Sequence, residues 1–88
     1  MSDEDTLLEF PCEFPIKVMA RVHEALENDV IEIVKAHAPD FDASTLKRRE
    51  SAQGNYIGLT ITITATSKEQ LDNIYHSLHA YEHCVMLL

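Results

Sequence analysis

The sequence predicts one small α+β domain, in which two helices cover one face of a four-stranded, mostly antiparallel sheet. Three observations lead to this prediction. The 88-residue chain is 45% hydrophobic, which suits a single globular core. Two segments repeat apolar residues at helical spacing, and four others have the pattern of strands. Their order is strand, helix, strand, strand, helix, strand. We expect the domain to span residues 10–88, after a flexible acidic lead-in over residues 1–9.

The first strand and the first helix are separated by a change of hydrophobic period. Pro11 and Pro15 favour extended backbone at the residues before them, ahead of a strand over residues 16–19. Apolar residues then recur every three or four positions from Val22 onward, which predicts an amphipathic helix. Pro39 cannot continue that helix, so the helix ends one or two residues earlier.

The middle of the chain predicts two strands and a capped helix. Residues 45–51 form a charged strand, which we expect at an edge because cationic side chains discourage pairing with other chains. Residues 56–66 alternate apolar side chains with threonine and are the clearest strand. Thr66 or Ser67 caps the second helix, and Gln70 fits a capping box in which its side chain reaches back to the N–H of the cap residue.

The last strand, over residues 83–88, completes the sheet. Period two places Val85 and Leu87 toward the core, and Cys84, Met86 and Leu88 on the opposite face. A right-handed crossover between the first two strands leaves room for the third strand between them. The sequence therefore predicts a ferredoxin-like βαββαβ sandwich with the strand order 4-1-3-2.

One face of this predicted sheet has no helix over it, and we expect recognition to occur there. Its expected residues are Lys17, Met19, Tyr56, Thr60, Thr62, Thr64, Cys84, Met86 and Leu88. Such a mixture of apolar and hydroxyl groups is typical of an interface, which favours a homo-oligomer, such as a dimer, or the docking of another protein. An edge strand could equally mediate association, and a solvated threonine-rich sheet is the alternative interpretation.

The charge of the chain excludes several partners. Lys plus Arg number 7 against 15 Asp plus Glu, which gives a net charge of −8. This balance argues against binding to nucleic acid or to anionic membranes. The Lys47-Arg48-Arg49 run is expected to be solvated. Its functional alternative is an anion site that Lys47 and Arg49 form with Lys17 or Arg21.

Metal binding and catalysis have weaker signals. Asp72, His76 and His79 share one flank of the second helix and would suit zinc, although solvated side chains explain the same spacing. No catalytic motif is present, so we expect neither an enzyme nor a cofactor. His37 is expected to interact with the last carbonyls of the first helix.

The two cysteines, Cys12 and Cys84, are expected to be free thiols. They lie near opposite ends of neighbouring strands, at a separation of about 15–20 Å, which is beyond the reach of a disulfide. The acidic N-terminus also lacks the positive charge that begins a secretory signal. We therefore expect a cytoplasmic protein.

Several motifs resemble the YbeD-like family of small bacterial proteins of unknown function. They are Phe10-Pro11-Cys12-Glu13-Phe14-Pro15-Ile16-Lys17-Val18-Met19, His37-Ala38-Pro39, Ser51 with Gly54-Asn55-Tyr56, and the ending Cys84-Val85-Met86-Leu87-Leu88. The resemblance implies a fold similar to ACT regulatory domains, which bind small molecules at subunit contacts. The chain departs from the family pattern at Ala20, where glycine is usual, and at Gly58, where serine is common.

Our leading hypothesis is a non-enzymatic ACT-like regulatory or interaction module that associates with itself or a partner and responds to a small-molecule effector. The alternative is a metal-binding protein or a metal-dependent enzyme that uses Asp72, His76 and His79.

Overall fold

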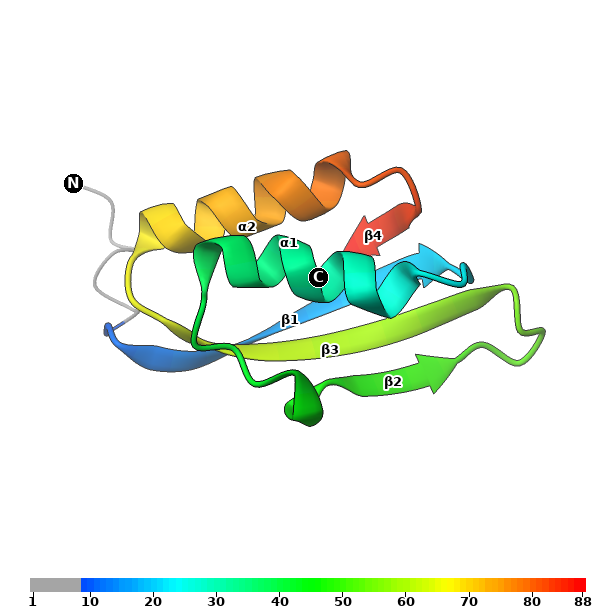
Figure 1. The fold of residues 1–88 in the computed structure, drawn as a ribbon, viewed down its shortest axis with the longest axis horizontal. Helices are drawn as coiled ribbons and strands as arrows, with labels where there is room; N and C mark the ends of the chain where they lie inside the picture. Colours follow the sequence, from blue (N-terminus) through cyan, green and yellow to red (C-terminus); the bar gives the residue numbers. More distant parts are fainter. Residues whose placement is uncertain (1–8) are drawn as a thin grey trace.

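A computed structural model describes residues 9–88 and confirms the α+β sandwich (Figure 1). The elements are β1 (Cys12–Arg21), α1 (Leu26–His37), the short 3₁₀ turn η2 (Ala43–Thr45), β2 (Lys47–Glu50), β3 (Tyr56–Ala65), α2 (Lys68–Ala80) and β4 (Cys84–Leu87). The sheet order is β2-β3-β1-β4, which is the predicted order read from the other edge. All three strand pairs are antiparallel. Of the expected lead-in over residues 1–9, all but Glu9 lies outside the described residues.

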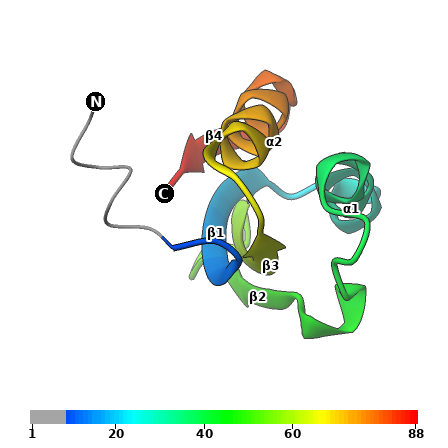
Figure 2. The same cartoon turned by 90° about the vertical axis from the view of Figure 1, so that its left-hand side faces the viewer.

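The core lies between the sheet and the two helices. Both helices lie on the same side of the sheet (Figure 2), so the other side is uncovered, as the sequence predicts. The buried residues of the strands and helices are Ile16, Val18 and Ala20 of β1, Leu26, Val30 and Val34 of α1, Ile57, Leu59, Ile61, Ile63 and Ala65 of β3, and Leu71, Ile74 and Leu78 of α2. Their periods of two in strands and of three or four in helices are what the sequence predicts. Phe41 packs under the loop before β2 and is also buried.

Strand β1 is longer than the sequence predicts and contains Pro15 in its interior. Lys17 exchanges both backbone hydrogen bonds with Leu88, so its N–H points toward the β4 side. Because backbone direction repeats every two residues, Pro15 directs its nitrogen to the same side. Strand β4 ends at Leu87, so it offers no partner there, and the missing N–H of Pro15 breaks no ladder hydrogen bond.

The first helix begins later than predicted. Val22 was expected to start it, but α1 begins at Leu26. The backbone N–H of Val22 instead donates to the carbonyl of Asn55 at 3.1 Å, which extends the pairing of β1 with β3 by one residue. Val22 is accordingly exposed. Val22 therefore continues the strand, and its helical spacing from the apolar residues of α1 is a coincidence.

A bulge in β4 gives Val85 and Cys84 orientations opposite to those predicted. Val18 pairs with Leu87 and Met19 with Met86, but Ala20 pairs with Cys84, so Val85 has no partner. The extra residue reverses the alternation of side chains beyond it. Val85 is 48% exposed rather than buried, and Cys84 packs against the core rather than on the uncovered face. Leu87 faces the core, as predicted.

Gln70 and His37 connect the start of α2 to the end of α1. Ser67 caps α2, since its hydroxyl accepts from the backbone N–H of Gln70 at 3.1 Å. The Gln70 side chain accepts from the N–H of Thr66 at 2.7 Å, one residue before the expected partner, and donates to the carbonyl of His37 at 2.9 Å. The His37 ring lies 3.1 Å from the Ser77 hydroxyl. His37 therefore links the two helices through its side chain, which corrects the prediction that it contacts the last carbonyls of its own helix.

The edge strand β2 is held to α1 by an ion pair. All four of its residues are exposed, as the sequence predicts for an edge. Arg48 donates two hydrogen bonds to the carboxylate of Glu27, and this contact lowers the pKa of the Glu27 carboxyl. Within residues 9–88, neither helix has the length and apolar character that crossing a bilayer requires.

Candidate functional site

The uncovered side of the sheet, which we call the outer face, is assembled by the strand register. Its residues are Lys47 and Arg49 of β2, Tyr56, Gly58, Thr60, Thr62 and Thr64 of β3, Glu13, Pro15, Lys17, Met19 and Arg21 of β1, Met86 of β4, and Leu88. The register sets these side chains in rows across the strands. One row is Met86, Met19, Gly58 and Arg49, and the next is Leu88, Lys17, Thr60 and Lys47.

The outer face collects positive charge in an otherwise acidic protein. Four of the seven Lys and Arg side chains belong to it, namely Lys17, Arg21, Lys47 and Arg49. Within residues 9–88, none of the four forms an ion pair with a carboxylate. Glu13 is the one carboxylate that the register places on this face, and it lies opposite Thr64, far from the cations. The face therefore has a positive region whose cations are not engaged in ion pairs.

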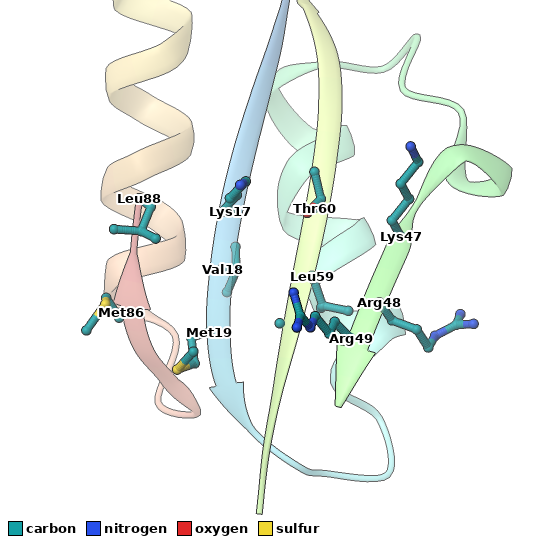
Figure 3. A pocket seen from close by; sticks show the side chains of 11 residues that line it. Lys17, Val18, Met19, Lys47, Arg48, Arg49, Leu59, Thr60, Met86 and Leu88 are labelled. Carbon is teal, nitrogen blue, oxygen red and sulfur yellow. The ribbon is translucent and has the colours of Figure 1, made fainter. Parts of the chain in front are cut away.

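Gly58 opens a hollow in the middle of that region. The hollow has a volume of about 280 Å³. Figure 3 shows that its lining comes from all four strands, with the Arg49 side chain extending from β2 across β3. The residues around it on the outer face are Lys17, Met19, Lys47, Arg49, Gly58, Thr60, Met86 and Leu88. A second hollow of about 270 Å³ adjoins it, shares Met19, Arg49 and Gly58 with it, and is also lined by Glu50 of β2. We call the first one the Gly58 hollow.

Most of the predicted face residues meet at these hollows. Lys17, Met19, Thr60 and Met86 line the Gly58 hollow, and Tyr56 lines the adjoining one. Thr62 and Thr64 share the outer face but lie farther along β3, where they pair with Pro15 and Glu13 and line neither hollow.

The structure brings together some residues of the predicted anion site. Lys47 and Arg49 of the edge strand join Lys17 around the Gly58 hollow, whereas Arg21 lies on the same face one row beyond it, opposite Tyr56. Gly58 itself was missed as a site residue. Its signal in the sequence is the absence of a side chain at one outward position of a strand whose other outward residues are tyrosine and threonine.

The chemistry of the Gly58 hollow suits the binding of an anion. Its lining side chains comprise cations, thioethers, aliphatic groups and one hydroxyl. Arginine and lysine side chains hold anions through charge-assisted hydrogen bonds.

The candidate metal ligands do not form a cluster. Asp72, His76 and His79 are exposed on α2, and the Asp72 carboxylate accepts from the Lys68 ammonium at 3.2 Å. Residues 9–88 contain no group of three or more His, Cys, Asp or Glu side chains placed to hold a metal ion. His83, which lies beyond the helix, stacks on the ring of His23, with the ring centroids 4.2 Å apart.

Both cysteines are free, and they lie farther apart than the sequence suggests. Cys12 stands at the start of β1 and Cys84 pairs with Ala20 near its end. Eight strand residues at about 3.4 Å each separate the two positions by roughly 27 Å. Burial raises the pKa of the Cys84 thiol, which makes it less reactive as a nucleophile.

Comparisons with known proteins agree with this architecture. The family model described as "Protein of unknown function (DUF493)" matches residues 5–88. The UPF0250 protein NE1487 of Nitrosomonas europaea is 48% identical over 85 residues, which cover 97% of this chain and 98% of that protein. A UPF0250 protein of Chromobacterium violaceum is 46% identical over the full length of both chains. The resemblance that the sequence motifs indicate is thereby confirmed.

A solved structure shares the fold. The solution structure of protein HP0495 from H. pylori superposes with a TM-score of 0.72, covering 92% of this chain and 85% of that one. Its sequence identity is 11%, so the likeness concerns the fold alone.

Proposed function

This chain belongs to the DUF493 family of proteins of unknown function, and from that premise we propose that it is a non-enzymatic interaction module that binds an acidic segment of a partner protein on its outer face. We place this binding in the cytoplasm, since the two cysteines are free thiols. A regulatory effect on the partner is part of the proposal and rests on the resemblance to ACT domains.

The observation that carries the proposal is the group of cations on the outer face. Lys17, Lys47 and Arg49 surround one hollow, and no carboxylate of residues 9–88 forms an ion pair with them. A face built for solvent alone would more often mix charges of both signs. Positive potential concentrated on one surface attracts and orients an anionic partner before contact.

A second copy of the chain fits the outer face less well than an acidic partner. Around a twofold axis that passes through the Gly58 hollow, two outer faces would bring their cations close together, which is unfavourable. The edge strand β2 and the part of β1 that β4 leaves open are also poor templates for pairing. Strand β2 presents three consecutive cations, and Pro15 interrupts the open edge of β1. An acidic partner of different sequence avoids the repulsion between the cations of two outer faces.

Fluorescence anisotropy with a dye-labelled peptide tests the proposal. The probe is an eleven-residue peptide of alternating serine and glutamate that begins with serine and has leucine at its centre, so that a glutamate lies two residues before and two residues after the leucine. We expect the wild-type chain to bind it, and added NaCl to weaken the binding because exposed charges are screened. Combining Lys47→Glu with Arg49→Glu should weaken binding at least about tenfold, since like charges then oppose each other across the contact.

A matched variant controls for the change in net charge. Combining Lys35→Glu with Lys68→Glu alters the net charge by the same amount but acts on the two helices, away from the outer face. This control should bind the peptide nearly as well as the wild type, after circular dichroism has shown that both variants fold. Equal weakening by the two pairs of substitutions, or no binding by the wild type, would refute the proposal.

A further inference from the structure

We infer that the Gly58 hollow receives one apolar side chain of the acidic partner, and that carboxylates two residues before and two residues after it contact the cations on either side. This inference rests on the proposed function and specifies the sequence that the outer face recognises. The recognised segment is extended and has the pattern acidic-x-apolar-x-acidic.

The volume of the hollow favours a side chain over a metabolite. Pockets for small molecules commonly enclose about 300–1,000 Å³ and bury most of the ligand. The Gly58 hollow has about 280 Å³ and opens onto a sheet surface (Figure 3). A free metabolite would bury little of its surface there. One leucine, methionine or phenylalanine side chain that belongs to a longer segment would be held by its neighbours as well.

The lining of the hollow favours an apolar occupant. Met19 and Met86 stand side by side on one flank and are 42% and 50% exposed, and Leu88 beside them is 71% exposed. Water therefore contacts three large apolar side chains that an incoming group would cover. Methionine adapts its shape to different partners because its side chain is unbranched and polarisable. This flank accepts an aliphatic or aromatic side chain without demanding a single shape.

The register places cations on both sides of the row that contains Met19 and Met86. The row of Met19, Gly58 and Arg49 is followed in one direction by Lys17, Thr60 and Lys47, and in the other by Arg21 and Tyr56. Neighbouring rows are two residues apart, which is roughly 6.8 Å along a strand. Side chains on one face of an extended peptide repeat at the same interval. A central apolar residue with an acidic residue at each second position therefore matches all three rows.

Arg49 contributes to the hollow itself. Its side chain extends across β3 (Figure 3), and the register pairs Arg49 with Gly58. A guanidinium group binds a carboxylate through two parallel hydrogen bonds, which lysine cannot do. Arg49 is thus placed to fix one of the flanking carboxylates while the apolar side chain lies against the methionines.

Two peptides test the inference by anisotropy. The first is the glutamate and serine peptide with a central leucine, and the second has glycine at that centre with the same charge. We expect the wild-type chain to bind the leucine peptide about fivefold more tightly than the glycine peptide. Full burial of a leucine side chain would provide a larger gain, but the hollow is open on one side and buries the side chain only in part.

Filling the hollow should abolish this preference. A Cβ atom at Gly58 would meet its nearest atom, the Arg49 carbonyl oxygen, at 3.6 Å, which is an ordinary contact. Gly58→Leu should therefore fold, with its side chain occupying the hollow, and should bind both peptides with similar affinity. Thr64→Leu is the matched control, because it adds the same side chain to the outer face beyond both hollows and should keep the fivefold preference.

The outcomes separate this inference from the proposed function. If the wild type binds both peptides equally and in a salt-dependent way, the role of the hollow is refuted and the acidic-partner proposal stands. The inference is also refuted if Gly58→Leu keeps the preference for the leucine peptide. If neither peptide binds the wild type, the proposed function fails, and this inference fails with it.

Discussion

Removing the Gln70 side chain tests how the two helices are joined above the sheet. Gln70→Ala deletes the hydrogen bonds from the Thr66 N–H, at 2.7 Å, and to the His37 carbonyl, at 2.9 Å. Each such bond contributes about 0.5–1.5 kcal/mol net, and the Thr66 contact is exposed to water, so we expect a total loss of about 1.5 kcal/mol. For a domain of this size that loss lowers Tm by roughly 6–12 °C.

Urea denaturation followed by circular dichroism measures the free energy of unfolding of this variant, and calorimetry measures its Tm. Gln53→Ala is the control, because Gln53 lies exposed in the turn between β2 and β3. The control should stay within about 0.5 kcal/mol of the wild type, as surface substitutions usually do. If Gln70→Ala is no less stable than Gln53→Ala, the hydrogen bonds of Gln70 do not hold the helices together, and our reasoning is wrong.

Two further predictions concern stability. Tyr81→Phe removes the 2.6 Å hydrogen bond to Asp29 and should cost about 1–2 kcal/mol at pH 7, whereas Tyr56→Phe should cost little. Desolvation, followed by this contact, raises the pKa of Tyr81 above its usual value of 10.0. The stability that the Tyr81 hydroxyl contributes is therefore complete below pH 10 and is lost as pH rises further. The free energies of unfolding of the wild type and of Tyr81→Phe should therefore converge in alkali; a constant difference between them would contradict this. Leu87→Ala should cost about 1–2 kcal/mol and Val85→Ala less than about 0.5, and the reverse order in urea denaturation would disprove the bulge in β4.

The sequence was sufficient to predict the fold because the apolar pattern is consistent in the central elements. The alternation in β3 fits only a strand and the spacing in α2 fits only a helix, and the buried residues follow these two patterns. The mistakes lie where pairing between distant segments decides the outcome. Val22 fits a helical pattern, but its hydrogen bond to Asn55 makes it the continuation of a strand. Such a bond has no signature in either local sequence.

The candidate site was predicted in part for the same reason. The alternation of β1 and β3 assigns Lys17, Met19 and Thr60 to the outer face directly. The part that Arg49 and Gly58 play depends on the register of β2 against β3, which sets them opposite each other. A short, charged edge strand carries no hydrophobic pattern that fixes its register. The hollow could therefore be located only in three dimensions.

The separation of charge between the two sides of the molecule has a consequence for its diffusion. Four cations lie on the sheet side, while α1 and α2 carry two cations, Lys35 and Lys68, against five carboxylates, namely Glu27, Asp29, Glu32, Glu69 and Asp72. Such a molecule is an electric dipole, and a dipole near an anionic object experiences a torque that turns its positive end forward. Collisions would thus begin with the sheet leading even though the protein as a whole repels anions. At physiological ionic strength this rotation is confined to the last ~8 Å of approach.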